Sequence, residues 1–167
     1  MKIGFDFDRV LFDTDTFNKY LKENVEGLKH VDASPYNENE VYSPEIHAEL
    51  CGIPVERIYG AIEDTSQFLY PDVEALKDIN HEVVIISRGE KEFQKAKIEN
   101  SGILSHVDDF YVIEKGAKDQ VDIDILVDDT LSETERVSIP SILFKREEEG
   151  LEDAVNKVNE LATRESV

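Results

Sequence analysis

The sequence predicts an α/β protein: a doubly wound, Rossmann-like parallel sheet of about five strands, with a small helical insertion after the first strand. Two observations support this class. Short apolar runs alternate with segments of helical period, which is typical of βαβ units and a parallel sheet. Polar residues follow the ends of these runs, and ligands of such sheets bind outside the carboxyl ends of the strands, near the point where strand order reverses. The sequence therefore predicts a site at that edge.

The first apolar run, residues 3–5, leads directly into the carboxylates Asp6 and Asp8. Because the run is short and turn residues flank it, it is interpreted as a buried strand rather than a helix. Both carboxylates can then point into one crevice beyond the sheet edge. There they repel each other, raise each other's pKa or share a cation. A turn-capping role for the pair is the alternative interpretation.

The later strands and helices follow in order. Strands are expected at residues 82–86, 110–113, 123–127 and 139–144. Pro140 near the start of the last strand is typical of an edge. A helix over residues 90–100 is stopped by Ser101-Gly102. A final helix over residues 148–163 carries its apolar residues on one face, so we expect it to pack on the sheet.

Residues 14–71 interrupt this pattern with an acidic, mostly helical insertion. Helices are expected over residues 16–28, 44–50 and 55–62, with a polar loop over residues 32–43. Pro44 suits the first position of the second helix. The sequence therefore divides into an α/β core, residues 1–13 and 72–167, and a helical insertion, residues 14–71.

Composition limits the classes of partner. The formal net charge of −20 argues against nucleic acid, whose phosphates demand a basic face, and against anionic membrane surfaces. The single Cys51 cannot form an internal disulfide. No apolar run approaches the length of a membrane span. The expected first strand begins so close to Met1 that no signal or transit peptide is expected, and we predict a cytoplasmic protein.

The polar residues at the strand ends resemble, in order, the motifs of the haloacid dehalogenase-like (HAD) superfamily, most of whose members are magnesium-dependent phosphatases. The matching residues are Asp6, Asp8 and Val10 for the first motif, Ser87 for the second, and Asp128 with Asp129 for the fourth. The third motif is a lysine upstream of the fourth strand. The resemblance covers about residues 1–13 and 72–145, and the insertion resembles by position the cap of phosphatase-type members. The four matches are specific together, whereas Ser87 alone would carry no weight.

The chemistry of the first motif is consistent with this resemblance. A carboxylate can attack phosphorus and form an aspartyl-phosphate, which divides one difficult displacement into two easier ones. Asp6 is the expected nucleophile. Asp8 is placed to protonate the leaving alkoxide and later to deprotonate the attacking water. The resemblance supports this division, because members that act on carbon–halogen bonds generally lack the second aspartate.

A divalent cation is expected among these carboxylates, because a phosphate group would otherwise be repelled. Mg2+ prefers an octahedron of oxygen ligands. The resemblance implies that Asp6 and Asp129 supply side-chain oxygens and Asp8 its backbone carbonyl. Asp128 is either a further ligand or an acceptor outside the ligand set, and the sequence leaves both open.

Donors for the phosphoryl oxygens are also expected. Ser87, with the backbone N–H groups at the start of the following helix, is expected to form an anion-binding corner, and Arg88 is a further candidate phosphate contact. A lysine is needed to neutralise developing charge. Lys118 is preferred because it stands ten positions before Asp128, a spacing similar to that in the deoxyribonucleotidase branch of the family. Lys115 is the competing candidate.

Together these residues predict a Mg2+-dependent phosphomonoesterase that acts on a small phosphorylated metabolite, as a 5′-nucleotidase-like enzyme or a sugar phosphatase. An insertion with few basic residues suits a small monophosphate better than a polyphosphate. The alternative is a non-catalytic regulatory protein that binds metal or phosphate with the same fold. The spacing of the aspartates excludes an EF-hand loop. The sequence does not predict the exact substrate or the oligomeric state.

Overall fold

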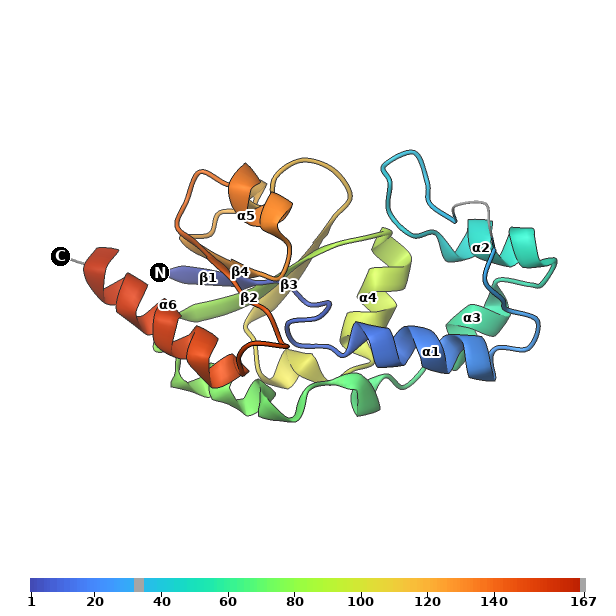
Figure 1. The fold of residues 1–167 in the computed structure, drawn as a ribbon, viewed down its shortest axis with the longest axis horizontal. Helices are drawn as coiled ribbons and strands as arrows, with labels where there is room; N and C mark the ends of the chain where they lie inside the picture. The colour runs from blue at the N-terminus through green and yellow to red at the C-terminus, as the bar shows by residue number, and fades with distance from the viewer. Residues whose placement is uncertain (32–34, 166–167) are drawn as a thin grey trace.

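The computed structural model describes residues 1–31 and 35–165. It contains a five-stranded sheet in the order β3-β2-β1-β4-β5, in which every neighbouring pair is parallel (Figure 1). The strands are β1 Lys2–Phe5, β2 Glu82–Arg88, β3 Asp109–Ile113, β4 Ile125–Asp128 and β5 Ser141–Leu143. The predicted α/β class with a parallel sheet is confirmed.

The strand order reverses at β1, the central strand. The chain first builds β2 and β3 on one side of β1 and then crosses to add β4 and β5 on the other. Phe5, at the end of β1, lies in register with Ile85 of β2 and Val127 of β4. The carboxyl ends of these three strands therefore meet at one edge of the sheet, where a ligand site is expected.

Apolar side chains cover the sheet on both faces. One face packs against η2 (Pro71–Asp78), α4 (Lys91–Glu99) and α6 (Leu151–Glu165) in the larger hydrophobic cluster. The opposite face forms a smaller cluster with Val84, Ile86, Ile123 and Leu126. Gly4 lies on this second face, and an added Cβ there would approach the Ile123 side chain at 2.9 Å. The lack of a side chain at Gly4 thus allows close packing beneath the central strand.

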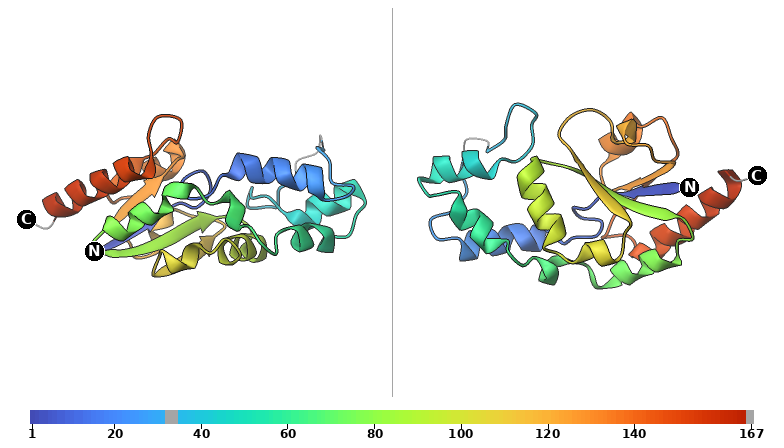
Figure 2. Two further views of the ribbon diagram at one scale, coloured as in Figure 1. Left: turned by 90° about the horizontal axis from the view of Figure 1, so that it is seen from below. Right: turned by 180° about the vertical axis from the view of Figure 1, so that it is seen from behind.

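The chain between β1 and β2 forms α1 (Thr14–Asn24), α2 (Pro44–Cys51) and α3 (Glu56–Ala61). These helices gather at the end of the molecule opposite the carboxyl terminus of α6 (Figures 1 and 2). Asp13 caps α1 by accepting a hydrogen bond from the Thr16 backbone N–H. The helix ends at Asn24, four residues earlier than predicted, and Gly27 then turns the backbone at a φ of 84°. The predicted loop over residues 32–43 lies partly outside the described residues.

Several other element boundaries differ from the prediction. β4 begins at Ile125, two residues later than expected. β5 has three residues and follows Pro140, which has no N–H to donate to a neighbouring strand. A short helix, α5 (Leu131–Arg136), and the 3-10 turn η4 (Lys118–Gln120) were not predicted. Both lie near the carboxyl end of β4, and both carry residues of the candidate site.

The last helix, α6, packs on the core as predicted. It begins at Leu151, three residues later than expected, and buries Leu151, Val155 and Val158 on one face. The opposite face is polar, so α6 is amphipathic. Among the described residues, no helix combines the length and apolar character needed to cross a lipid bilayer.

Candidate active site

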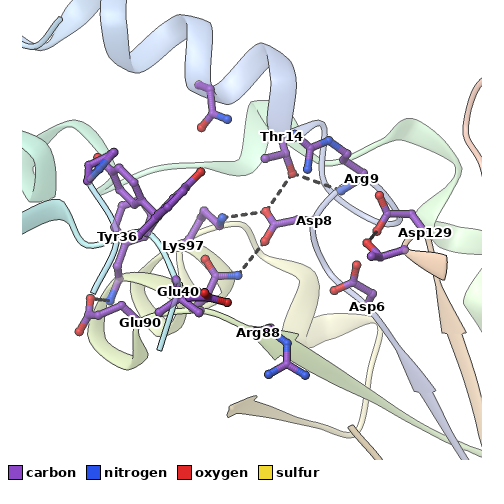
Figure 3. Close-up of a pocket in the computed structure, with 18 of the residues that line it drawn as sticks. Asp6, Asp8, Arg9, Thr14, Tyr36, Glu40, Arg88, Glu90, Lys97 and Asp129 are labelled. Carbon is purple, nitrogen blue, oxygen red and sulfur yellow. Dashed lines mark hydrogen bonds and ion pairs between the residues drawn. The ribbon is translucent and has the colours of Figure 1, made fainter. Parts of the chain in front are cut away.

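The chain that follows β1 separates the directions of Asp6 and Asp8. The Asp6 backbone N–H donates to the Val127 carbonyl at 2.9 Å, which extends the pairing of β1 with β4. The chain then turns around the carbonyl of Phe7, with Arg9 at a left-handed φ of 64° that non-glycine residues rarely adopt. The Asp8 side chain consequently points away from the Asp6 carboxylate, although both line the same cavity (Figure 3).

Lys118 connects the carboxylates that follow β1 and β4. Its Nζ lies 2.9 Å from Oδ1 of Asp6 and 2.6 Å from Oδ2 of Asp128, and the residue is 1% exposed. Lys115, the competing candidate, is exposed and does not line the cavity. The geometry therefore brings Lys118, and not Lys115, to Asp6. Burial raises the pKa of Asp6 well above its ordinary value; the Lys118 ammonium opposes this rise, and the Asp128 carboxylate adds to it.

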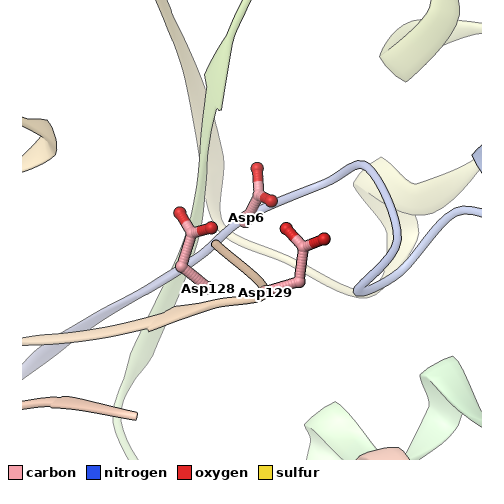
Figure 4. A group of neighbouring side chains, drawn as sticks. All are labelled: Asp6, Asp128 and Asp129. Carbon is pink, nitrogen blue, oxygen red and sulfur yellow. The ribbon is translucent and has the colours of Figure 1, made fainter. Parts of the chain in front are cut away.

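Asp6, Asp128 and Asp129 form a group that could hold a metal ion (Figure 4). One carboxylate oxygen of each lies within 4.8 Å of the others. Three carboxylates meet one ammonium here, so the group has excess negative charge, and its oxygen donors fit a hard divalent cation. Asp128 is buried and also accepts a hydrogen bond from the Thr130 backbone N–H at 3.0 Å, so it lies both in this group and against Lys118. The Asp8 side chain lies outside the group.

The Asp8 carboxylate is bound by residues that the sequence did not predict. Its Oδ1 accepts hydrogen bonds from Lys97 Nζ at 2.7 Å and Thr14 Oγ1 at 2.8 Å, and its Oδ2 accepts one from Gln94 Nε2 at 2.8 Å. Burial by itself would raise the pKa of Asp8, but the charge of Lys97 and these hydrogen bonds outweigh it and hold the pKa below its ordinary value. The spacing of Gln94 and Lys97 on the helix after Ser87 was the available signal, because residues three apart share a helix face.

The two predicted phosphate contacts on β2 are both engaged by protein groups. Ser87 is buried, and its hydroxyl accepts a hydrogen bond from Gln94. The Arg88 guanidinium binds both carboxylate oxygens of Glu133, at 2.7 and 2.8 Å. It also donates to the carbonyls of Glu114 and Gly116. Arg88 lines the cavity, and its contact with phosphate stays a prediction.

The sequence predicts that backbone N–H groups at the start of α4 bind an anion, but three of these groups already donate to acceptors within the protein. The Gly89 N–H donates to the Ile113 carbonyl at 3.0 Å. The N–H groups of Glu92 and Phe93 donate to the carboxylate of Glu90, which caps the helix. A carboxylate at this position satisfies free amides and complements the positive end of the helix dipole. The Glu90 carboxylate thus occupies the position at the start of α4 where an anionic ligand was predicted.

A cavity of about 740 Å3 connects these groups with the helical insertion. Asp6, Asp8 and Asp129 line it on the core side, and Lys22 and Tyr36 line it on the side of the insertion (Figure 3). Its volume falls within the range that accommodates small metabolites. All the site residues predicted from the sequence except Ser87 line this cavity, together with Thr14, Gln94, Lys97 and Glu133, which were not predicted. Ser87 is fully buried behind the cavity wall and reaches it through its contact with Gln94.

Comparisons of the sequence with known proteins gave no match, either to a protein-family model or to a curated protein. Solved structures do match the fold. A haloacid dehalogenase-like family hydrolase from Xanthomonas campestris aligns over 87% of this chain and 82% of its own, with a TM-score of 0.52 and 16% identity. A haloacid dehalogenase-like hydrolase from Burkholderia xenovorans aligns over 84% of this chain and 78% of its own, with a TM-score of 0.61 and 21% identity.

A third structure, the HAD-hydrolase YfnB from Bacillus subtilis bound to magnesium, aligns over 93% of this chain and 98% of its own, with a TM-score of 0.59 and 10% identity. The alignments extend beyond the sheet to most of the chain in each case. This chain therefore has the fold of the haloacid dehalogenase-like hydrolases.

Proposed function

We propose that this chain is a Mg2+-dependent phosphomonoesterase that forms an aspartyl-phosphate on Asp6. The observation that carries the proposal is the group formed by Asp6, Asp128 and Asp129 beside the buried ammonium of Lys118. The group lies at the carboxyl ends of β1 and β4, where strand order reverses. The fold shared with haloacid dehalogenase-like hydrolases and the order of the motifs along the chain also support the proposal.

The first half of the reaction uses the groups around Asp6. A carboxylate oxygen of Asp6 attacks phosphorus while the bond from phosphorus to the ester oxygen breaks. Lys118 stabilises the charge that develops on the phosphoryl oxygens. Asp6, Asp128 and Asp129 would hold the cation, with the Asp8 backbone carbonyl, and its charge would offset that of the carboxylates and the phosphoryl group. The raised pKa of Asp6 favours its protonated form, whereas attack requires the carboxylate. A bound cation would favour the carboxylate, so the raised pKa supports the proposal of a cation beside Asp6.

Asp8 transfers protons in both halves of the reaction. In the first half its protonated form would give a proton to the departing ester oxygen. The carboxylate that results, which is the form that the lowered pKa favours, would later take a proton from the water that attacks the aspartyl-phosphate. Its side chain lines the cavity near the insertion, where the leaving group would lie. The presence of this second carboxylate favours phosphate ester hydrolysis over dehalogenation. Members of the HAD superfamily that act on carbon–halogen bonds generally lack a carboxylate at this position.

The substrate class follows from the size and charge of the cavity. Its volume of about 740 Å3 suits a sugar phosphate or a nucleoside monophosphate. On the side of the insertion, Lys22 is the one lysine or arginine among the described residues that line the cavity, and Glu40 adds a negative charge there. This lining offers little positive charge for further phosphate groups, so we propose a monophosphate.

A screen of phosphate release from a panel of monophosphates, with and without Mg2+, tests the proposal. We expect release that stops with EDTA and returns with Mg2+. Asp6→Asn should lower kcat by about 10⁴-fold or more, with an unchanged circular dichroism spectrum. Asp122→Asn is the matched control, because Asp122 is exposed and lies outside the cavity. Full activity of Asp6→Asn would contradict the nucleophile assignment. Mg2+ binding without turnover on any substrate would favour the non-catalytic alternative.

A further inference from the structure

Lys97 is a buried cation in the wall of the cavity that the mechanism above does not use. Its side chain comes from α4 and is 5% exposed. The Nζ lies 5.4–5.5 Å from the ring centroids of Phe12, Phe17 and Phe93, and 2.7 Å from Oδ1 of Asp8. Aromatic faces attract an ammonium group. The three rings therefore hold the Lys97 side chain in place, and its ammonium group forms an ion pair with the Asp8 carboxylate.

The donors around Asp8 determine where its carboxylate points. Lys97 and Gln94 reach it from α4, and Thr14 reaches it from the start of α1. Figure 3 shows Lys97 and Thr14 around the Asp8 carboxylate, with Asp129 and Asp6 on the other side of Asp8. Oδ1 has two donors, whereas Oδ2 has Gln94 and so retains a lone pair. The carboxylate is thus held apart from the three carboxylates of the cation group while it can still accept a proton.

We propose that Lys97 is a positioning residue that holds the Asp8 carboxylate toward the cavity and away from the cation group, ready to act as the base in hydrolysis of the aspartyl-phosphate. The inference rests on the proposed function. Without Lys97, a divalent cation nearby would attract Asp8 as a further carboxylate ligand. The charge-assisted hydrogen bond from Lys97 opposes that attraction, because such bonds are roughly twice as strong as neutral ones.

The step that depends on this position is the second half of the reaction. The water oxygen forms a bond to phosphorus, the bond from phosphorus to the Asp6 oxygen breaks, and the water proton moves to the Asp8 carboxylate. The products are inorganic phosphate and the free Asp6 carboxylate. With p-nitrophenyl phosphate the first half needs no proton donor, because nitrophenolate is a good leaving group. Loss of Lys97 should therefore slow the second half and leave the first half nearly unchanged.

Steady-state kinetics of Lys97→Met with p-nitrophenyl phosphate and Mg2+ test this inference. We expect kcat to fall by about 10²-fold or more, KM to fall in parallel, and kcat/KM to stay within a few-fold of wild type. Phosphorylated protein should accumulate and appear in the intact mass after acid quenching. Lys97→Arg should restore part of kcat. Lys95→Met is the matched control on the same helix, because Lys95 is exposed and pairs with Glu99.

Equal losses in kcat and kcat/KM, with no phosphorylated protein, would show a merely structural role and overturn the inference. A wild-type protein that releases no phosphate from any substrate would instead contradict the proposed function, and the inference with it. If Lys97→Met does not fold, Asp8→Asn/Lys97→Met removes both charges and leaves neither unpaired. Adding Lys97→Met to Asp8→Asn should then leave kcat unchanged if Lys97 acts through Asp8, and a further tenfold loss would contradict the inference.

Discussion

Two buried lysines bind the two carboxylates that follow β1, and their surroundings differ. Lys118 binds Asp6 and Asp128 and lies near Glu133, at 3.8 Å. Lys97 lies among three aromatic rings and binds Asp8. The pKa of Asp6 is raised, because burial and neighbouring carboxylates outweigh Lys118. The pKa of Asp8 is lowered, because Lys97 and two neutral donors outweigh burial.

The ratio of carboxylates to ammonium groups therefore decides what each end of the cavity can do. Around Lys118 the negative charge is in excess, so that end attracts further positive charge. Around Lys97 one ammonium meets one carboxylate, so the charges at that end are balanced. We therefore expect the first end to respond to a cation and the second to respond to loss of its ion pair.

The largest expected effect is the loss of stability in Lys97→Met. Breaking a buried ion pair leaves an uncompensated charge and costs about 3–5 kcal/mol of the free energy of unfolding. Asp8→Asn/Lys97→Met should recover most of this loss, because no buried charge remains unpaired. Urea denaturation of both variants measures the difference. A loss below about 1 kcal/mol in the single variant would mean that Lys97 is not buried as a charged group.

The next effect is on catalysis at the other lysine. Lys118→Ala should lower kcat by about 10²–10³-fold, because an electrostatic contact that strengthens in the transition state is lost. KM should change less than kcat. Lys115→Ala provides the control and should stay within a few-fold of wild type, since Lys115 is exposed outside the cavity. A large loss in Lys115→Ala with a small one in Lys118→Ala would mean that Lys115, and not Lys118, is the lysine of the third motif.

Mg2+ should stabilise the protein through the carboxylates near Lys118 and not through Lys97. A ligand that binds only the folded state adds about 2.7 kcal/mol at 100 times its Kd. Asp129→Ala should lose this stabilisation, whereas Lys97→Met should keep or increase it despite its lower starting stability, because the released Asp8 carboxylate can then approach the cation. Thermal unfolding at increasing Mg2+ concentrations measures both. A wild-type Tm that does not change with millimolar Mg2+ would contradict the proposed cation site.

The smallest effect concerns an ion pair outside the main cavity. Its stability should not depend on Mg2+, so it is a reference for the ion pairs of Lys97 and Lys118. Arg146 binds both carboxylate oxygens of Asp72, at 2.7 and 2.9 Å. Burial by itself would raise the pKa of Asp72, but hydrogen bonds from Arg146 and from the Leu151 N–H lower it. A carboxyl group whose folded pKa lies below its unfolded value of about 3.9 stabilises the fold above that pH, and this is lost as the pH falls through the folded pKa.

The expected result is that Asp72→Asn costs about 1–2 kcal/mol at pH 7 and less at pH 3, by urea denaturation in EDTA. Since Asp72 does not line the main cavity, the difference should be the same with and without Mg2+. A cost that grows as the pH falls would contradict the sign of the pKa shift.

Much of the fold could be predicted, because its determinants are local. Each strand is an apolar run that ends in polar residues, and parallel pairing then gathers those ends at one edge. The resemblance to the HAD superfamily, through the spacing of Lys118 to Asp128, favoured Lys118 over Lys115, and the structure places Lys118 between Asp6 and Asp128. Boundaries were less predictable: α1 ends before the turn at Gly27, and its apolar pattern continues past its end to Leu28.

The contacts around Asp8 could not be predicted, because they join distant segments. Lys97 and Asp8 are 89 positions apart, and Arg88 and Glu133 are 45 apart. The spacing of Gln94 and Lys97 places both on one helix face, but nothing in a single sequence links that face to Asp8. The self-capping of α4 by Glu90 is different, since a carboxylate just before a helix is a local signal. Glu90 therefore caps the helix at the position where the sequence predicts an anion site.

The position of β1 at the centre of the sheet has a consequence for how the protein folds. The first strand of the chain pairs with β2 and β4, and Asp6 meets Lys118 across 112 positions. Folding is slower when native contacts join distant parts of the chain, because the entropy of loop closure is lost before those contacts form. We therefore expect β1 to stay unpaired until β2 is available, and the carboxylates to come together late in folding. The strand order that assembles the site is thus also expected to slow folding.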